Sequence, residues 1–360
     1  MERQVFRNIS PLDHRYSVGD TELWGSLSAY LSEEAGIRYL LKVEAALAKA
    51  LASLGVAPES AAREIVAACS QVTPEEVFAE EEKTRHNIRA LVNSIQAKVS
   101  PAAKPWVHFT ATSADIMDSA TAAKYKGFTS DIVLPELKTL IDTLLRLARA
   151  EKETLQIGRT HGQYAVPITF GYYLAGYVQR LGSAYERISV ASADLRGKMA
   201  GAVGAYNASS LIVSDPLKLE ELVMAELGIK ASPFSTQIVE PEYLLTLMHE
   251  YVTCFGILAN FADDIRHLQR SEIAEVGEYF APEQVGSSTM PHKRNPWNFE
   301  HVKSLWKEFS PRIMTMYMDQ ISEHQRDLTN SASARFLVEI VAGLVLATKR
   351  LTKVIGRLAV

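Results

Sequence analysis

Residues 26–54, SLSAYLSEEAGIRYLLKVEAALAKALASL, carry the pattern that decides the fold class. Their apolar side chains recur at three- and four-residue spacing, as in Leu27, Leu31, Leu47 and Leu51. That spacing places apolar groups along one face of an α-helix. Gly55 follows directly, at the position where a glycine commonly ends a helix. This stretch therefore predicts a long amphipathic helical segment closed by a glycine.

The same periodicity recurs along most of the 360 residues. It is present at 134–147, 167–200, 242–270 and 338–360, whereas strand-like alternation is scarce. Long helices with wide apolar faces bury those faces by packing into bundles. We therefore expect an all-α protein with a small N-terminal helical domain over 1–110 and a long-helix bundle over 111–360.

Composition narrows the class of function. Lys and Arg number 38 against 42 Asp and Glu, so the net charge of −4 argues against general nucleic-acid binding. Cys69 and Cys254 form no CxxC pair and the histidines show no HExxH spacing, so we expect neither a metal site nor a cofactor. No apolar run approaches the roughly 20 residues of a membrane span. The charged start of the chain is unlike a secretory signal. We expect a cytoplasmic enzyme that binds no membrane.

Residues with catalytic chemistry gather in the polar connectors between the predicted helices, which are 8–20, 83–88, 106–115, 157–167, 201–215, 231–241 and 281–297. The most informative is GSSTMPHKRNP, residues 286–296. Its glycine and prolines indicate a loop. Hydroxyl, imidazole, ammonium and guanidinium groups lie together in it, a set that suits an anionic substrate, carboxylates in particular.

This loop closely resembles the signature of the fumarase/aspartase superfamily, whose members eliminate fumarate or an analogue. The sequence of residues 290–296 is similar to the corresponding segments of adenylosuccinate lyases and of carboxymuconate cycloisomerases. GRTHGQ at 158–163 and HFTATSAD at 108–115 resemble two further blocks of the superfamily. The resemblance runs from about residue 8 to 340 and implies a fumarase/aspartase-like bundle. The family usually continues into a third helical domain, before which this chain is expected to stop.

Three other segments resemble the adenylosuccinate lyases in particular. They are TRHN at 84–87, SPLDHRY at 10–16 and QRDLTNS at 325–331. Asn87 stands where Asp is common in that branch, which bears on how His86 is oriented. The last two segments resemble nucleotide-binding segments, so the implied partner is a small nucleotide substrate.

Elimination across a carbon–nitrogen bond needs an acid for the departing nitrogen, a base for the carbon-bound proton and cations for the developing charge. Histidine titrates near neutrality, so His161 is predicted as the general acid, with His86 as the alternative. The resemblance implies Ser287 as the general base, with Ser288 as its competitor. Amides of the Gly-Ser-Ser turn and Lys293 are expected to stabilise the serine alkoxide.

The remaining candidates would bind substrate. Lys293 and Asn295 are expected to hold the succinyl carboxylates. The hydroxyls of Thr112, Ser113 and Thr160 can donate to a carboxylate or phosphate. Alternatively, they cap helices. Nucleotide contacts are expected from Arg15, Tyr16, Arg326, Ser331 and Arg335. The resemblance adds Arg85, His108, Gln237 and Met290, and implies that Glu300 fixes an imidazole by a hydrogen bond.

The stretch between Thr112 and His161 is almost wholly helical by pattern. A helix of some 35 residues spans roughly 50 Å, so the two residues cannot share a site in one chain unless Gly127 or Pro135 breaks the rod. The resemblance likewise implies a homotetramer with sites built from several chains. Three functions stay open: an adenylosuccinate lyase, another superfamily enzyme such as a carboxymuconate cycloisomerase or argininosuccinate lyase, and a non-catalytic helical scaffold. The candidate nucleotide contacts favour the first.

Overall fold

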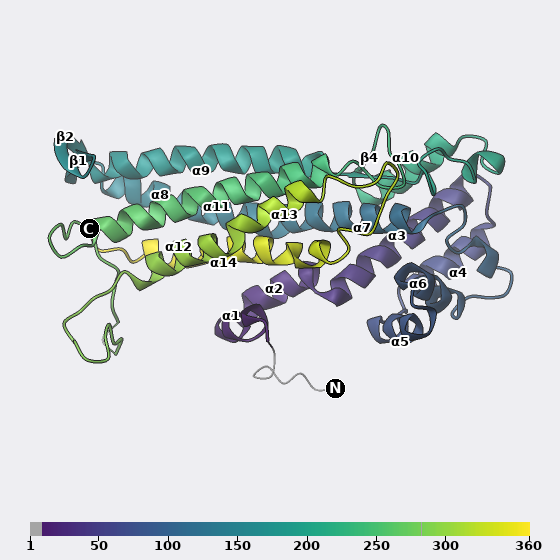
Figure 1. Cartoon of the computed structure of the whole chain (residues 1–360), viewed down its shortest axis with the longest axis horizontal. Coiled ribbons are helices and arrows are strands. Elements are labelled where there is room, and N and C mark those ends of the chain that lie inside the picture. The colour runs from purple at the N-terminus through teal and green to yellow at the C-terminus, as the bar shows by residue number, and fades with distance from the viewer. Residues whose placement is uncertain (1–8, 282) are drawn as a thin grey trace. The chain divides into compact units, whose positions relative to one another are not determined.

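The computed structural model describes residues 9–281 and 283–360. Over these residues it contains fourteen α-helices and four short strands, which confirms the all-α class (Figure 1). The chain forms two compact units. Unit 1 comprises the residues up to Phe128 with Ser192–Leu245 and Asp319–Ser331, and unit 2 comprises Thr129–Ala191, Thr246–Met318 and Ala332–Val360. The division at residue 110 stays a prediction. The chain start that we compared with a secretory signal lies outside the described residues.

Unit 1 is built around helix α3. Its helices are α1 Arg15–Gly19, α2 Thr21–Leu31, α3 Glu33–Ser53, α4 Glu59–Cys69, α5 Pro74–Thr84, α6 Asn87–Gln96, α7 Ser113–Phe128 and α10 Pro216–Leu227. Short 3₁₀ turns lie at Pro11–Asp13, Lys104–Trp106 and Ser209–Leu211. The two-residue strands β3 Arg196–Gly197 and β4 Lys230–Ala231 pair in parallel. Helix α3 packs against α4, α7 and α10, so its long apolar face forms the centre of this unit.

The helical segment predicted over 26–54 is two helices, because Ser32 interrupts it. Ser32 has an extended backbone, and its hydroxyl caps the first turn of α3. The predicted glycine end is confirmed. Gly55 has a φ of 69°, and the amide of Val56 donates to the carbonyl of Leu51 at 2.9 Å. These are the features of a left-handed glycine cap.

Unit 2 is a bundle of long helices. They are α8 Leu134–Ala150, α9 Phe170–Ala193, most of α11 Glu242–Leu268, α12 Trp297–Phe309, α13 Ile313–Met318 and α14 Leu337–Ile355. Short 3₁₀ turns lie at Ser310–Arg312 and Ser333–Phe336. Helix α14 packs against both α8 and α12. Helices α9 and α11 are joined where the Tyr177 hydroxyl donates to Asp264 at 2.5 Å and its ring packs on Phe261.

The predicted helical run after Thr112 is confirmed. Helix α7, a π-helical turn at Thr129–Val133 and α8 follow one another without a gap. Pro135 does not break the run because it lies in the first turn of α8, where a missing N–H is tolerated. Gly127 allows a close approach of α3 to α7, since a Cβ there would lie 3.0 Å from the Tyr39 hydroxyl.

The connector expected at 157–167 is instead part of an antiparallel hairpin. Strand β1, Leu155–Thr160, pairs with β2, Gln163–Thr169. His161 and Gly162 form the two-residue turn, and their φ values of 55° and 73° are both positive. Positive φ at both positions is typical of the type I′ turns that join twisted strands.

Helix α11 is the one described helix that is long and apolar enough to cross a membrane by length and composition. Of its most apolar window, 56% is buried inside the protein. Tyr251, Phe255 and Leu258 on this helix are fully buried. A core helix passes the same test, and α11 packs as one.

Candidate active site

His86 lies at the start of α6 and caps it. Its Nδ1 accepts a hydrogen bond from the amide of Arg89 at 3.2 Å. Because Nδ1 is the acceptor, the neutral ring carries its proton on Nε2. The side-chain amide of Asn87 turns to the Met117 sulfur at 3.6 Å. The backbone of α6, and not residue 87, therefore orients His86. Arg85, next to it, is exposed and has a φ of 54°.

His108 lies in the loop before α7 and pairs with a buried carboxylate. Its Nδ1 lies 2.6 Å from Oε1 of Glu44, a side chain on α3 with no exposed surface. Burial lowers the pKa of His108, but the charge and hydrogen bond of Glu44, helped by Asp115, outweigh it, so the pKa is raised overall. Arg89 acts in the opposite direction. His108 and Thr110 both have positive φ, 59° and 66°, so this loop is conformationally strained.

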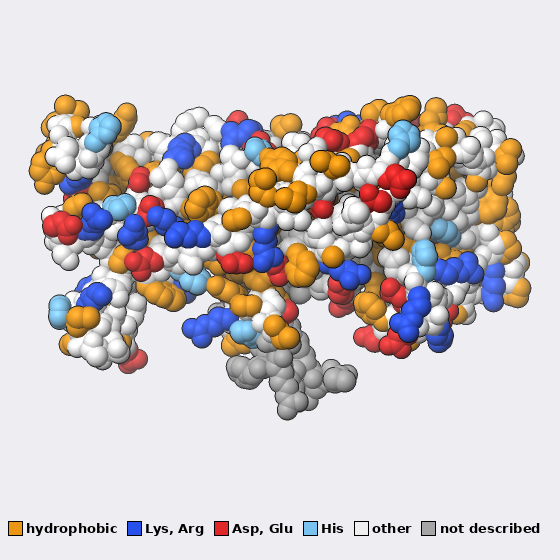
Figure 2. Space-filling model, viewed as in Figure 1, with side chains coloured by type: hydrophobic (Ala, Val, Ile, Leu, Met, Phe, Trp, Pro, Cys, Tyr) orange, Lys and Arg blue, Asp and Glu red, His pale blue; other side chains and the backbone are white. Residues whose placement is uncertain are grey.

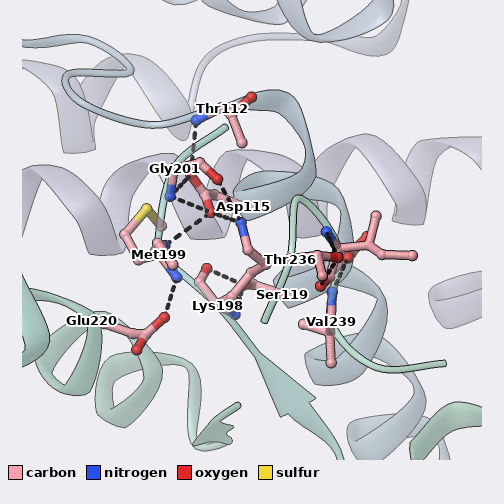
Figure 3. Close-up of polar contacts among 12 residues, drawn as sticks. Thr112, Asp115, Ser119, Lys198, Met199, Gly201, Glu220, Thr236 and Val239 are labelled. Atoms are coloured by element: carbon pink, nitrogen blue, oxygen red, sulfur yellow. Dashed lines mark hydrogen bonds and ion pairs between the residues drawn. The ribbon is translucent and has the colours of Figure 1, made fainter. Parts of the chain in front are cut away.

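Thr112 and Ser113 open helix α7 beside a buried ion pair (Figure 3). The amide of Thr112 donates to Asp115 at 2.8 Å. Asp115 also accepts from the amides of Ala200 at 3.1 Å and Gly201 at 3.2 Å, and it pairs with the Lys198 ammonium. The Asp115 and Lys198 side chains have no exposed surface. The pair therefore fixes the 198–201 loop against the start of α7, next to the two candidate hydroxyls.

Gln237 and Arg326 come to the same part of unit 1, although they are distant in sequence. The hydroxyl of Thr236 donates to the carbonyl that precedes Arg326, at 3.1 Å. The amide of Val239 donates to the Asp118 carboxylate on α7 at 2.9 Å. Burial raises the pKa of Asp118 to about 6. One turn of α7 thus holds the segment that carries Gln237, and that segment contacts the one that carries Arg326.

The other nucleotide candidates of unit 1 lie at its surface. Arg15 and Tyr16 lie on the five-residue helix α1, with Arg15 exposed and Tyr16 half-buried. Ser331 is exposed and its amide donates to the carbonyl of Leu328. Arg335 belongs to unit 2 and is exposed in the 3₁₀ turn at Ser333–Phe336.

The signature loop of unit 2 closes on itself. The Ser287 oxygen accepts from the amides of Thr289 at 3.4 Å and Met290 at 3.2 Å. The Asn295 side chain donates to the carbonyl of Gly286 at 3.0 Å. A Cβ at Gly286 would lie 2.0 Å from the Lys293 carbonyl oxygen, so the closed loop requires glycine. The Met290 and Lys293 side chains are exposed.

A buried carboxylate fixes the helix that follows this loop. Glu278 accepts from the amides of Asn298 at 2.8 Å and Phe299 at 3.1 Å, and from the Asn298 side chain at 2.7 Å. Burial raises the pKa of Glu278. An acidic group at a helix N-terminus stabilises the helix. Glu300 lies exposed in the first turn of the same helix, α12.

The hairpin presents His161 at its tip, directly after Thr160. Glu275 anchors strand β1 by accepting from Arg159 at 2.5 Å and from Gln156 at 2.9 Å. The Arg159 guanidinium also lies over the Tyr164 ring. The His161 ring is exposed and has no hydrogen-bond partner among the described residues. It is held in place by the turn alone and is open to a substrate.

The candidates thus fall into two sets, one in each unit. Over residues 9–281 and 283–360 no cluster of His, Cys, Asp or Glu is arranged to hold a metal ion. The sequence reasoning missed the side chains that hold these segments, namely Glu44, Lys198, Glu275 and Glu278. These residues lie far along the chain from the segments they hold or belong to no recognisable sequence motif. The sequence alone therefore gives no pattern that identifies them.

Comparison with known proteins identifies the class. Residues 14–307 match the model of a lyase family. An adenylosuccinate lyase from Pyrococcus abyssi is 37% identical over 92% of this chain and 72% of its own length. One from Archaeoglobus fulgidus is 35% identical over 96% and 75%. The crystal structure of a 3-carboxy-cis,cis-muconate lactonizing enzyme from Pseudomonas putida superposes with a TM-score of 0.82 at 27% identity, covering 93% of this chain and 75% of that one.

The chain belongs to this lyase family, within the fumarase/aspartase superfamily. Its place in the family is with the adenylosuccinate lyases.

Proposed function

We propose that the protein cleaves adenylosuccinate to AMP and fumarate, and that it cleaves the succinyl-carboxamide ribonucleotide of purine synthesis in the same way. The proposal rests on the adenylosuccinate lyases to which the chain is similar. The structural observation that carries it is the closed signature loop around Ser287. Both substrates lose a nitrogen group from a succinyl carbon, so one acid and one base serve both reactions.

Ser287 is the proposed base. Deprotonated serine is costly unless its negative charge is stabilised. The two backbone amides that donate to the Ser287 oxygen would donate more strongly to an alkoxide, as in an oxyanion hole. This arrangement favours Ser287 over Ser288. The exposed ammonium of Lys293 serves the substrate carboxylates, whereas Asn295 shapes the loop through its hydrogen bond to Gly286.

His161 is the proposed acid. A general acid must hold a proton and then release it during each turnover. His86 would lose its hydrogen bond to the Arg89 amide on gaining a second proton, so protonation of His86 uncaps α6. The His161 ring makes no hydrogen bond among the described residues that protonation would break. His86 therefore acts as a neutral donor through Nε2, and the proton cycle falls to His161.

The nucleotide half is proposed to contact Arg15, Tyr16, Arg326, Ser331 and Arg335. Guanidinium groups match the geometry of a phosphate, and a tyrosine ring offers a face for a base. Thr112, Ser113 and Thr160 are proposed as hydrogen-bond donors to the anionic groups, and Gln237 as a further contact. Glu300 is proposed to orient a histidine ring.

We further propose a cytoplasmic homotetramer in which several chains build each site. The hairpin exposes Leu155, Tyr164 and Val166, whose exposed fractions are 83, 78 and 67%. Figure 2 shows hydrophobic side chains where Figure 1 labels β1 and β2. A two-stranded hairpin is marginal alone in water, and an apolar surface of this kind favours a protein contact. Such a contact would deliver His161 to a neighbouring subunit. Light scattering that finds a monomer at assay concentrations would contradict this.

The test is an ultraviolet assay of the purified protein with adenylosuccinate, in which AMP and fumarate are measured together. Argininosuccinate and carboxymuconate serve as control substrates. Turnover confined to adenylosuccinate supports the proposal, and turnover of carboxymuconate alone would replace it with a cycloisomerase.

Two substitutions test the assigned roles. His161→Ala and Ser287→Ala should each lower kcat roughly a hundredfold or more, because each removes one proton transfer. Ser288→Ala is the matched control and should retain most activity. A mutant of His161 or Ser287 that is weakened only a few-fold would show that the role was wrongly assigned.

A further inference from the structure

We propose that Glu44 is a positioning residue that keeps His108 as an imidazolium, oriented to donate from Nε2 to an anionic group of the substrate. The inference rests on the proposed function and extends it, because it concerns how the site recognises a phosphate or a carboxylate. Glu44 itself does not touch the substrate.

Glu44 and His108 form a buried ion pair, in which His108 is the charge partner of the Glu44 carboxylate. Glu44 projects from the middle of α3, and its Oε1 lies 2.6 Å from His108 Nδ1. Its other oxygen is buried without a hydrogen-bond partner among the described residues. A buried carboxylate left without a cation is strongly unfavourable, so folding favours a charged His108. Burial and then Glu44 raise the pKa of the nearby Cys69 thiol to about 12, so this thiol stays neutral beside the carboxylate.

The pairing leaves one edge of the ring for a ligand. Nδ1–H is used by Glu44, so Nε2–H is the remaining donor of the imidazolium. The His108 side chain is 19% exposed, which leaves part of the ring accessible, whereas Glu44 is fully covered. The His108 backbone is held at a φ of 59° in the strained loop that leads to Thr112. A residue held in a sparsely populated conformation, with its ring fixed by a buried carboxylate, is preorganised for binding.

Charged groups from three helices face this ring. Glu44 on α3 and Asp115 on α7 favour the imidazolium, and Arg89 on α6 opposes it together with burial. The net result is a raised pKa for His108. The cation therefore persists to a higher pH than in an ordinary histidine and is lost only as the pH rises through that raised value. Removal of the Glu44 charge should move this loss to lower pH.

The experiment measures binding by calorimetry between pH 6 and pH 8.5, with AMP as the phosphate probe and fumarate as the carboxylate probe. The variants are Glu44→Gln, which keeps an acceptor for Nδ1–H without charge, and Glu44→Asp, which keeps the charge. Glu220→Gln is the matched control, because Glu220 is also buried in unit 1 but bonds to the Met199 amide and the Tyr206 hydroxyl. All profiles are compared with the wild type, since the AMP phosphate titrates in this range as well.

We expect Glu44→Gln to weaken binding of one probe about tenfold at pH 8 and by less at pH 6. The probe that is weakened identifies the anionic group that His108 binds. Glu44→Asp and Glu220→Gln should keep the wild-type pH profile. A loss in Glu44→Gln that is equal at pH 6 and pH 8, or no loss at all, overturns the proposal and leaves Glu44 a packing residue. A wild-type protein that binds neither probe overturns the proposed function as well, whereas an active wild type with a flat Glu44→Gln difference overturns this inference alone.

Discussion

The two residues of the buried ion pair between α7 and the 198–201 loop should differ sharply in how much their loss lowers the stability. Asp115 and Lys198 are both fully buried, but they are not equally supported. Asp115 accepts from three backbone amides as well as from Lys198, namely those of Thr112, Ala200 and Gly201. Beyond Asp115, the Lys198 ammonium donates to one other group among the described residues, the Gly201 carbonyl at 3.1 Å. The carboxylate is the centre of the network.

Removal of one partner of a buried pair costs about 3–5 kcal/mol. Lys198→Met leaves Asp115 with its three amide donors, so the expected cost is at the lower end, about 3 kcal/mol. Asp115→Ala leaves a buried ammonium and three amides without a partner, and each unpaired buried donor costs about 1–3 kcal/mol. The expected cost is therefore above about 5 kcal/mol. The two single variants should differ by roughly 2 kcal/mol or more, with the aspartate variant the less stable.

The assay is urea unfolding followed by circular dichroism, at one fixed protein concentration because subunit association adds to apparent stability. Lys83→Met is the matched control. Lys83 forms an exposed pair with Glu80 at 3.0 Å, and exposed pairs contribute about 0–1 kcal/mol. If Lys198→Met proved as destabilising as Asp115→Ala, the amides would not be supporting the carboxylate, and the reasoning from the hydrogen-bond network would be refuted.

Three further predictions follow from local geometry. Thr110→Gly should raise the stability by about 1 kcal/mol, seen as a higher unfolding midpoint, because a β-branched residue at a φ of 66° is strained by more than the entropy that glycine costs. Burial raises the pKa of Asp118 from 3.8 to about 6, so the folded state binds the proton more tightly and loses stability as the pH rises between these values. Asp118→Asn keeps an acceptor for Val239, and its unfolding midpoint should fall less over that range than the midpoint of the wild type. Glu275→Gln should lower kcat roughly tenfold to a hundredfold with little change in unfolding midpoint, because it loosens the hairpin that carries His161; an unchanged kcat would show that the anchor is dispensable.

The fold class follows from the sequence because helix periodicity is a local property. The apolar spacing over 26–54 and the glycine after it predicted the helical segment and its end. The break at Ser32 was missed, because a serine within an apolar period is read as a helical residue unless its extended backbone is known. The hairpin at 155–169 had a readable signal in the alternation of Tyr164, Val166 and Ile168, but two short strands within a polar connector resemble a loop.

The sequence predicted which segments carry the candidate site residues, but not how these residues are arranged in space. The chemistry of histidine in a polar connector indicated His161, whereas Ser287 was indicated by the resemblance of its loop to the superfamily signature. Their arrangement depends on contacts that no local pattern encodes. The amides that donate to Ser287 come from the turn that Gly286 permits, and the turn around His161 depends on two positive φ values.

Four segments of the candidate sites are each held by a carboxylate from elsewhere in the same unit. Glu44 holds His108, Asp115 holds the 198–201 loop, Glu275 holds the hairpin and Glu278 holds the start of α12. Polar loops cannot be fixed by burying apolar surface, because their reactive groups must stay open to substrate. Hydrogen bonds to a charged acceptor are about twice as strong as neutral ones, so one carboxylate can fix a loop while the reactive side chains remain exposed. An acidic residue in a helix resembles a solvated surface group in the sequence; only its burial makes it an anchor, and burial is a property of the folded chain.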